Sequence, residues 1–298
     1  MLIFIHIILA YSLNMPELPE VETIVRELIA TGLVGKQIAI AYVQWPKIID
    51  TSDDQVFIHQ IQGQSINHLE RRGKYLVFTL SQSTLFVHLR MSGKFEWLAN
   101  PLPIKKHEHV RLVFTDGTIL RYEDPRKFGR WSLYSDPLEK LSRLGLEPLS
   151  SNFTCSALTS MLQKYASQIK PFLLNQKHIV GLGNIYVDEA LWEAKINPQQ
   201  LTNSLTKKEI KALHQAIRNV LNKGIENKGT SLGVGVSNYY SVSGRRGGHQ
   251  HHLKVFRQQG LACSRCSTLI IKIVVAQRGT HLCPTCQKRE IFNEIKPL

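Results

Sequence analysis

The sequence predicts an α+β protein with several domains: a β-rich N-terminal domain preceded by a helix, a helical domain, and a metal-binding hairpin near the C-terminus. Short β-type runs fill residues 36–134, and helical periodicity takes over after Pro148. Two C-x-x-C pairs stand close to the C-terminus. A length of 298 residues with 43% hydrophobic residues suffices for two domains with cores of their own.

The first expected element is a helix over residues 16–32. Pro16 and Pro19 stand at its start, where the first turn tolerates proline, and Gly32 ends it. One face is apolar at the i, i+3, i+4, i+7, i+8 spacing of a buried stripe, formed by Val21, Ile24, Val25, Leu28 and Ile29. We therefore expect this face to cover part of a hydrophobic core.

The strands expected next are short β-type runs at Lys74–Leu80, Leu85–Leu89, Val110–Thr115 and Thr118–Tyr122. The Asp116-Gly117 pair between the last two runs is a strong signal for a tight hairpin. Several short strands with turn residues between them favour a β-sandwich or a β-barrel, and the residues alone leave both open.

After residue 148 the pattern is helical. Thr206 and Glu209 form a capping box, followed by one apolar face made of Ile210, Leu213, Ile217, Val220 and Leu221. A second helix is marked by Val187, Ala190, Leu191 and Ala194. Residues 229–252, rich in Gly, Ser and Arg, are interpreted as a mobile loop.

A tight turn, Gly181-Leu-Gly183-Asn184, opens the second of these helices. Unpaired N–H groups at a helix start bind anions, and in a basic chain we expect that anion to be a DNA phosphate. The plainer alternative is that Asn184 serves only as the N-cap of the helix.

The chain is strongly basic, with 37 Lys+Arg against 23 Asp+Glu and a formal net charge of +14. This excess indicates a polyanionic partner, either nucleic acid or an acidic membrane surface. Residues 1–14 are apolar but lack the basic region and cleavage site of a secretory signal, and they are too short to span a bilayer. We expect no membrane span.

The two cysteine pairs, Cys263/Cys266 and Cys283/Cys286, have the spacing of a zinc ribbon or finger. Four thiolates fill the tetrahedral shell that zinc prefers, so one structural zinc ion is expected, with no position for a catalytic water. Paired C-x-x-C motifs in a chain of this length indicate a reducing compartment. The hairpin between the pairs carries Lys272, Gln277 and Arg278, which suit contacts to phosphates.

A further basic segment is Asp124-Pro-Arg-Lys-Phe-Gly129. Two cations beside an exposed aromatic residue suit insertion into a base stack. Taken alone, the segment is better explained as a turn with a buried phenylalanine and solvated cations.

The most telling motif is Met15-Pro-Glu-Leu-Pro-Glu-Val-Glu22. Further motifs follow in order at 71–75, 88–93, 106–109, 124–129, 183–186 and 276–279. Together with the cysteine spacing, they resemble the bacterial formamidopyrimidine-DNA glycosylases (the Fpg/MutM family) from Met15 to about Lys288. The resemblance implies a catalytic β-sandwich domain at 15–148, a helix–two-turn–helix domain at 149–252 and a zinc finger at 253–290, with damaged double-stranded DNA in the cleft between them.

In this family the nucleophile is an N-terminal proline, which corresponds to Pro16. The resemblance assigns general acid–base work to Glu17, proton donation in β-elimination to Lys74, and the same role in δ-elimination to Arg278. Without the resemblance, these three would be a helix-start carboxylate, a strand-end charge and a solvated hairpin tip. Because the intact motif begins directly at Met15, we expect translation to start there and residues 1–14 to be absent from the mature protein. Removal of Met15 before the small Pro16 would then expose the secondary amine that the chemistry needs.

The resemblance also implies residues that contact DNA. Met91 and Phe128 would insert into the base stack at the gap that the extruded base leaves, and Arg126 would face the orphaned cytosine. The positions carried over as DNA contacts are His107, Arg126, Lys170 and Asn184. The loop near 230–250 would cap the extruded base. The sequence departs from the family at Tyr165, where relatives often carry a basic residue, so one phosphate contact is expected to be weaker.

The implied function is base-excision repair of oxidised purines (8-oxoguanine and formamidopyrimidines) by combined glycosylase and β,δ-elimination lyase chemistry. The alternatives are the sister group that removes oxidised pyrimidines and a non-catalytic lesion-binding protein with a blocked Pro16. The third residue of the Pro-Glu-Leu-Pro-Glu motif, Leu18, favours the purine branch, because the sister group typically has glycine there. A generic zinc-ribbon protein would leave the first 130 residues unexplained. We expect a monomer that acts in the bacterial cytoplasm, at the nucleoid.

Overall fold

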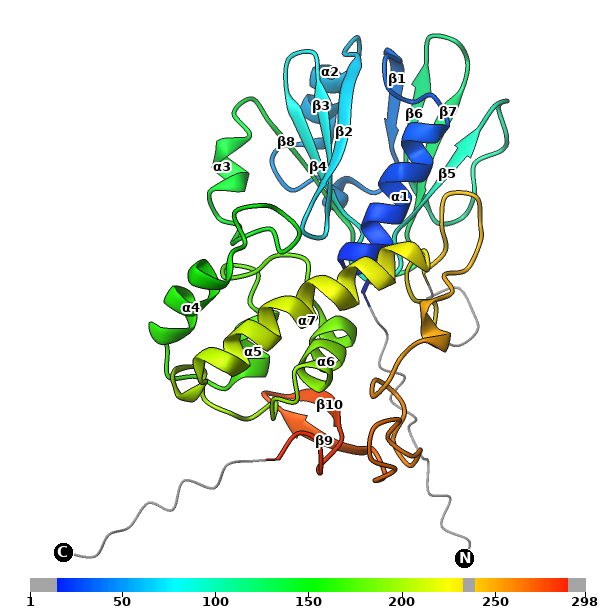
Figure 1. Cartoon of the computed structure of the whole chain (residues 1–298). Helices are drawn as coiled ribbons and strands as arrows, with labels where there is room; N and C mark the ends of the chain where they lie inside the picture. Colours follow the sequence, from blue (N-terminus) through cyan, green and yellow to red (C-terminus); the bar gives the residue numbers. More distant parts are fainter. Residues whose placement is uncertain (1–14, 233–238, 289–298) are drawn as a thin grey trace, which may run out of the picture.

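The computed structural model describes residues 15–232 and 239–288 (Figure 1). Two lobes are stacked, a β-rich lobe and a helical lobe, with the small hairpin β9–β10 at the far end of the helical one. The expectations for residues 1–14, for part of the 229–252 loop and for the last two residues of the 253–290 finger lie outside the described residues. In the described part of the chain, no helix is long and apolar enough to cross a membrane.

The β-rich lobe is a sandwich of two antiparallel four-stranded sheets, which decides between the sandwich and the barrel. One sheet has the order β1-β6-β7-β5, from β1 (Ile38–Val43), β5 (Lys94–Leu98), β6 (Glu108–Phe114) and β7 (Ile119–Glu123). The other has the order β2-β3-β4-β8, from β2 (Ile66–Arg72), β3 (Tyr75–Leu80), β4 (Thr84–His88) and β8 (Arg130–Tyr134). The short helices η1 (Pro46–Ile48) and α2 (Asp54–Ile61) complete the lobe.

The four expected strands are confirmed as β3, β4, β6 and β7, with ends that shift by one or two residues. The expected hairpin joins β6 to β7: Gly117 has φ +84, and the Asp116 carboxylate accepts the N–H of Thr118 at 3.0 Å. The sandwich core fills the space between the sheets, where Trp131 packs edge-on against Phe57 and Tyr122.

Helix α1 (Leu18–Ala30) connects the two lobes (Figure 1). Val21, Ile24, Val25 and Leu28 belong to the sandwich core, whereas Leu18 belongs to the core of the helical lobe. The expected burial of Ile29 is wrong: its side chain is 43% exposed. An eight-residue step turns Ile29 about 80° around the helix axis from Val21, so it lies at the edge of the buried stripe.

The helical lobe contains α3 (Leu138–Leu141), α4 (Cys155–Gln163), α5 (Ile169–Leu174), α6 (Asn184–Glu193), η2 (Thr202–Ser204), α7 (Lys207–Glu226) and η3 (His249–His251). The capping box of Thr206 and Glu209 is confirmed, and the five apolar residues expected on α7 are buried. Gly183, not Asn184, is the N-cap of α6, so the N-cap interpretation of Asn184 is wrong. The Asn184 side chain is engaged elsewhere.

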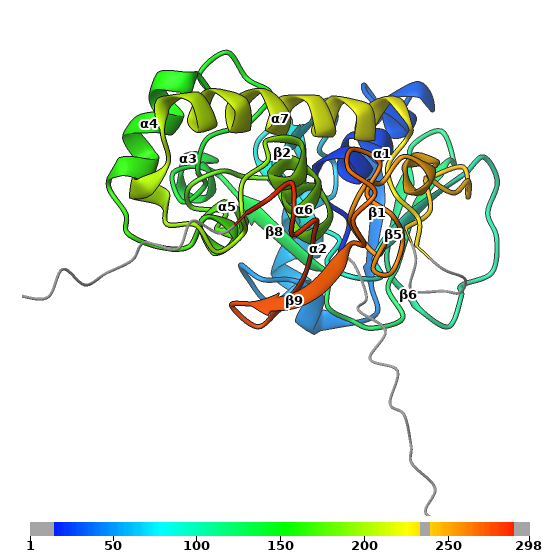
Figure 2. The same ribbon diagram turned by 60° about the horizontal axis from the view of Figure 1, so that its bottom comes forward.

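The C-terminal hairpin consists of β9 (Ile271–Val275) and β10 (Arg278–Leu282). Ala276 and Gln277 form its two-residue turn with φ values of 46 and 60, the left-handed geometry that matches the twist of a hairpin. This turn places Arg278 as the first residue of β10. Strand β10 packs on α6, and Figure 1 shows the hairpin at that end of the helical lobe; in Figure 2, where the bottom of this view is turned forward, β9 lies at the front.

Candidate functional site

The residues that follow Met15 lie where the two lobes meet. Pro16 and Glu17 are both buried. The N–H of Leu18 donates to the carbonyl of Gly181 at 3.0 Å, which fixes the start of α1 against the turn before α6. In this chain the Pro16 nitrogen is joined to Met15, whereas nucleophilic attack requires a free secondary amine.

The carboxylate of Glu17 occupies the amino end of α6. It accepts the N–H of Gly183 at 2.8 Å and of Ile185 at 2.9 Å, with Tyr186 more distant at 3.4 Å. The expectation of a DNA phosphate on these N–H groups is therefore wrong. The helix start does bind an anion, but the anion is a side chain of this protein.

This contact depends on the glycine at position 183. A Cβ atom there would lie 2.3 Å from Cδ of Glu17, closer than any real contact. The Gly-x-Gly turn is thus needed for the approach of the carboxylate to the backbone. It brings the acid of the N-terminal motif onto the helical lobe.

Burial makes the carboxyl of Glu17 an unusually weak acid. Removal from water raises the pKa of its carboxyl to about 7; the charge of Lys74 opposes the rise, and the charge of Glu20 adds to it. A carboxyl that titrates near neutrality can both give and take a proton at physiological pH. The electrostatics agree with the acid–base role expected for Glu17.

Lys74 is buried beside this acid, in the turn between β2 and β3. Burial lowers its pKa, while the charges of Glu17 and Glu20 act in the opposite direction and that of Arg278 lowers it further. The preceding residue, Gly73, donates its N–H to Glu147 at 2.9 Å, which holds the turn on the linker to the helical lobe. The structure thus brings Pro16, Glu17 and Lys74 together, and the exposed Arg278 lies near enough for its charge to act on Lys74.

A second buried carboxylate, Glu20, lies one turn further along α1. Its Oε2 accepts the N–H of Glu17 at 2.9 Å. Its Oε1 accepts the N–H of Thr230 at 2.6 Å and the hydroxyl of Tyr186 at 2.9 Å. The bond between Glu20 and Glu17 could have been predicted, because their three-residue spacing is that of a capping box. The bond to Thr230 joins distant parts of the chain and has no such signal in the sequence.

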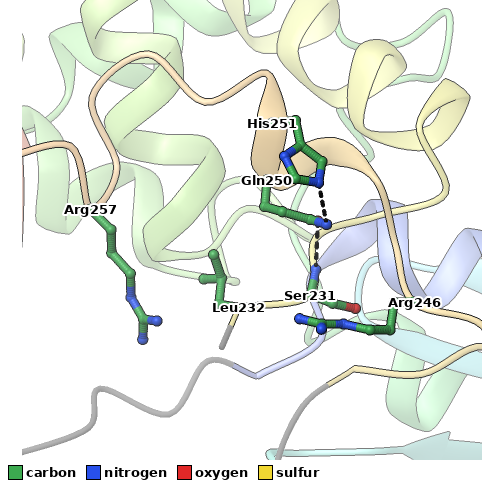
Figure 3. A pocket seen from close by; sticks show the side chains of 6 residues that line it. All are labelled: Ser231, Leu232, Arg246, Gln250, His251 and Arg257. Carbon is green, nitrogen blue, oxygen red and sulfur yellow. Dashed lines mark hydrogen bonds between the residues drawn. The ribbon is translucent and has the colours of Figure 1, made fainter. Parts of the chain in front are cut away.

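Ser231, the residue after Thr230, lines a cavity of about 520 Å³ (Figure 3). It is lined by Ser231, Leu232, Arg246, Gln250, His251 and Arg257. The Gln250 side chain crosses its wall and accepts the N–H of Ser231 at 3.2 Å. The volume lies within the range of small-ligand pockets, about 300–1,000 Å³.

The residues expected to enter the base stack lie on loops of the sandwich. Met91 is in the turn between β4 and β5; Arg126 and Phe128 are in the loop between β7 and β8. Phe128 is 45% exposed, so its interpretation as a core residue is wrong. The Arg126 guanidinium lies over the Phe128 ring at 4.8 Å, and His107 stands half-buried before β6.

Lys170 and Asn184 meet at the zinc hairpin. Both side chains donate to the carbonyl of Gly279, at 3.1 and 3.0 Å. Lys170 is fully buried and pairs with the equally buried Asp188 at 2.6 Å. Asp188 also accepts the N–H of His281 at 2.9 Å. In this structure the two expected DNA contacts hold the residue next to Arg278.

Asp188 was not singled out from the sequence. It lies four residues after Asn184 and therefore on the same face of α6, which is the signal that pairs them. Since a buried aspartate needs partners, an apolar helix face carrying Asp188 predicts a contact with another segment.

The four cysteines fit a zinc ion. Their sulfur atoms all lie within 4.8 Å of one another, with 3.9 Å between Cys263 and Cys286 and 3.4 Å between Cys266 and Cys283. A tetrahedron with Zn–S bonds of about 2.3 Å has edges of about 3.8 Å. Cys263, Cys283 and Ile270 share a small core with Trp192 of α6. The chain thus carries one structural zinc site, which ties the hairpin to the helical lobe.

Three family models match the chain in succession. They are the formamidopyrimidine-DNA glycosylase N-terminal domain over residues 15–131, the formamidopyrimidine-DNA glycosylase H2TH domain over 144–235, and the zinc finger found in FPG and IleRS over 260–289.

Curated relatives agree. The chain is 48% identical over 276 residues to the formamidopyrimidine-DNA glycosylase of Protochlamydia amoebophila, covering 92% of this chain and 100% of the relative. The enzyme of that name from Enterococcus faecalis is 47% identical over 278 residues, with 92% and 98% covered.

Solved structures of the Lactococcus lactis protein also match. One is a mutant of that protein bound to Fapy-dG-containing DNA, with a TM-score of 0.83, 40% identity, and 92% of this chain and 100% of that chain covered. Another is its complex with DNA containing an abasic site, with a TM-score of 0.82, 39% identity and the same coverage.

Proposed function

This chain belongs to the formamidopyrimidine-DNA glycosylase family, and on that basis we propose that it removes oxidised purines from duplex DNA and then cuts the strand. The observation that carries the proposal is the buried pair of Glu17 and Lys74 beside Pro16. The pKa of the acid is raised to about 7 and that of the lysine is lowered. The L. lactis protein has been solved on Fapy-dG and abasic-site DNA.

The chemistry begins with the free secondary amine of Pro16. Its lone pair forms a bond to C1′ of the damaged nucleotide as the glycosidic bond breaks, and the base leaves with a proton. The nitrogen then loses its proton, the C1′–O4′ bond of the sugar ring breaks with a proton passing to O4′, and the iminium that results acidifies the C2′ hydrogens. Loss of one of these protons breaks the C3′–O bond, and a second elimination breaks the C5′–O bond and releases the sugar.

The chain's own acids and bases serve these steps. Glu17, with a pKa of about 7, exchanges protons with the amine and the sugar. Lys74, whose pKa burial lowers, transfers the proton of the first elimination, and Arg278 assists the second. The zinc site takes no part in bond breaking; Cys263, Cys266, Cys283 and Cys286 hold the hairpin that carries Arg278.

DNA is bound between the lobes. Phe128 and Met91 fill the space left by the extruded base, and Arg126, stacked on Phe128, faces the orphaned base. His107 and Asn184 complete the DNA-binding set, and Lys170, whose ammonium is buried against Asp188, supports it through the Gly279 carbonyl that it holds next to Arg278. The cavity lined by Ser231 receives the extruded base; in support, the residue before Ser231, Thr230, donates its N–H to Glu20, which also accepts the N–H of Glu17.

We further propose that the protein acts as a monomer on the bacterial chromosome in the cytoplasm, where the zinc thiolates stay reduced. Its units are a catalytic domain at 15–148, a helix–two-turn–helix domain at 149–252 and a zinc finger at 253–290. In support of this division, the buried apolar residues form three clusters, each drawn mainly from one unit, with Leu18 and Trp192 reaching into the cluster of a neighbouring unit.

The direct test is borohydride trapping on a duplex that holds one 8-oxoguanine opposite cytosine. The full chain is compared with a form that starts at Pro16. A covalent adduct from the Pro16 form alone supports the amine chemistry. An adduct from both forms would assign the nucleophile to another amine, and an adduct from neither would remove the activity on this lesion. A thymine-glycol duplex in parallel tests the oxidised-pyrimidine alternative.

A further inference from the structure

One fully buried carboxylate stands at the centre of the loops that carry the stack-filling side chains. Asp124 is the first residue after β7, and its side chain accepts three hydrogen bonds. Oδ1 accepts the hydroxyl of Ser92 and the N–H of Arg126, the latter at 3.2 Å. Oδ2 accepts the N–H of Gly129 at 2.7 Å.

The main chain of Asp124 is engaged as well. Its N–H donates to the carbonyl of His107 at 2.9 Å. Its carbonyl accepts the N–H of Lys127 at 3.1 Å and meets Nε2 of His109 at 2.8 Å. The residue therefore ties together three separate segments: the turn after β4, the loop before β6 and the loop before β8.

Each bond of the carboxylate reaches a residue of the stack-filling set or the residue directly after one. Ser92 directly follows Met91, Arg126 is bound through its own N–H, and Gly129 directly follows Phe128. One side chain thus holds the backbone at Arg126 and beside Phe128, and the hydroxyl of the residue beside Met91.

The loops have little room to adapt if this carboxylate is lost. A Cβ at Gly129 would lie 1.9 Å from the hydroxyl of Tyr122, and a Cβ at Gly93 would lie 2.1 Å from the same atom. Lys127 adopts φ +59, a conformation that ordinary residues rarely take. The Asp124 bonds therefore hold a strained, tightly packed pair of loops in one arrangement.

We propose that Asp124 is a positioning residue for duplex entry: it pre-organises Met91, Arg126 and Phe128 as a single rigid wedge. The inference rests on the proposed function, because that function supplies the duplex to be entered. A rigid wedge loses less conformational freedom when it enters the stack, so more of the binding energy remains for unstacking the damaged base. The Phe128 ring is exposed to solvent and stacks on the Arg126 guanidinium, so it is accessible for this contact.

Substitution Asp124→Asn is the sharpest perturbation. Asparagine has one acceptor oxygen and an NH₂ group that only donates. If the NH₂ group faces Gly129, two donors oppose each other. If it faces Ser92, the hydroxyl can turn to accept, and the N–H of Arg126 keeps only its second, 3.3 Å bond to the Ser92 hydroxyl oxygen. In either orientation one backbone N–H that orients the wedge loses the oxygen of residue 124 that it binds in the wild-type chain, while size and shape are kept.

The test uses the full chain and a duplex with 2-aminopurine next to an uncleavable abasic analogue. Insertion of the wedge unstacks the probe and raises its fluorescence. At saturating protein, D124N should lower this rise by about half or more, because a disordered wedge enters the stack in only part of the complexes. S92A should give a smaller loss and S92T should restore it, since threonine keeps the hydroxyl. D116N, the same change at an exposed hairpin carboxylate, is the matched control.

A full fluorescence rise from saturated D124N would overturn the inference, as would a loss that S92T and D116N share. If the wild-type chain itself produces no rise, there is no wedge for Asp124 to position and the inference fails. Borohydride trapping at Pro16 is read separately, so a failure of the excision chemistry is distinguishable from a failure of the wedge.

Discussion

The carboxylate of Glu17 caps helix α6 of the opposite lobe, with its Oε1 2.9 Å from the nitrogen of Ile185. The acid is thereby held by backbone N–H groups that a helix start otherwise offers to a ligand. The geometry of the proposed catalytic site and the joining of the two lobes depend on the same contact, so changes at Glu17 or at the start of α6 should affect both.

The first prediction concerns pH. In the folded chain burial raises the pKa of Glu17 from 4.5 to about 7, so the native state holds this proton more tightly than the unfolded chain. The contribution of Glu17 to the free energy of unfolding therefore falls as pH rises from about 4.5 to about 7, by about 3 kcal/mol in total. Glu17→Gln should remove this slope. Urea unfolding at about pH 5 and about pH 8 checks it; equal pH dependence in both proteins would contradict the prediction.

Gly183→Ala should damage catalysis more than binding. The new Cβ would lie 2.3 Å from Cδ of Glu17 and would push the carboxyl away from Pro16. A misplacement of this kind costs about 100-fold in rate, measured as single-turnover base excision by the form starting at Pro16. Gly248→Ala is the control, because its nearest atom is the Asn227 carbonyl oxygen at 3.4 Å. Equal rates for both variants would show that Glu17 tolerates the shift.

Lys170→Met should lower stability. The change leaves Asp188 buried without its cation, and breaking one side of a buried ion pair costs about 3–5 kcal/mol. Arg278→Ala, at an exposed hairpin position, should change the free energy of unfolding by less than about 0.5 kcal/mol while δ-elimination is lost. Urea unfolding of both variants separates the two roles. An unchanged free energy of unfolding in the Lys170 variant would mean that the Lys170–Asp188 pair does not contribute to stability.

Zinc should be needed for DNA binding. Cys283→Ala removes one of the four sulfur ligands, so zinc content should fall and the hairpin with Arg278 should lose its fixed position. Metal analysis together with duplex affinity measures both effects. Cys155→Ala, which changes a half-buried cysteine of the helical core, should retain zinc. Undiminished affinity of the zinc-free protein would show that the hairpin is dispensable.

Duplex affinity should fall steeply with salt, because the basic chain displaces counterions from phosphates. Lys272→Ala, on the exposed strand β9, should reduce the slope of log affinity against log salt by about one. Binding titrations over a range of salt concentrations provide the slope. A profile that is flat for the wild-type chain would rule out the expected phosphate contacts.

Local patterns in the sequence were sufficient for the elements that depend on near neighbours. The capping box of α7, the Asp116-Gly117 hairpin and the cysteine spacing each combine residues a few positions apart, and all are confirmed. The fold class followed from the same patterns, because strand and helix periods differ over short windows.

What the sequence could not supply are the partners that only the tertiary structure brings together. The turn at Gly183 indicated an anion, but nothing local distinguishes a phosphate from a carboxylate 166 residues earlier in the chain. The burial of Lys170 and the three segments joined by Asp124 depend likewise on distant contacts. The assignment of Pro16, Lys74 and Arg278 came from the family resemblance, because each has an ordinary structural explanation when viewed alone.

The large sequence separation between Glu17 and the α6 N–H groups that it binds also bears on when the enzyme becomes active during its own synthesis. A ribosome makes the chain from the amino end, so the motif at Pro16 and Glu17 emerges long before Gly183 and Ile185 exist to receive the acid. Arg278 and the last cysteine pair arrive later still. We therefore expect a nascent chain to carry the Pro16-Glu17 motif before the rest of the proposed site exists, and DNA cutting to begin only after nearly all of the polypeptide has been translated.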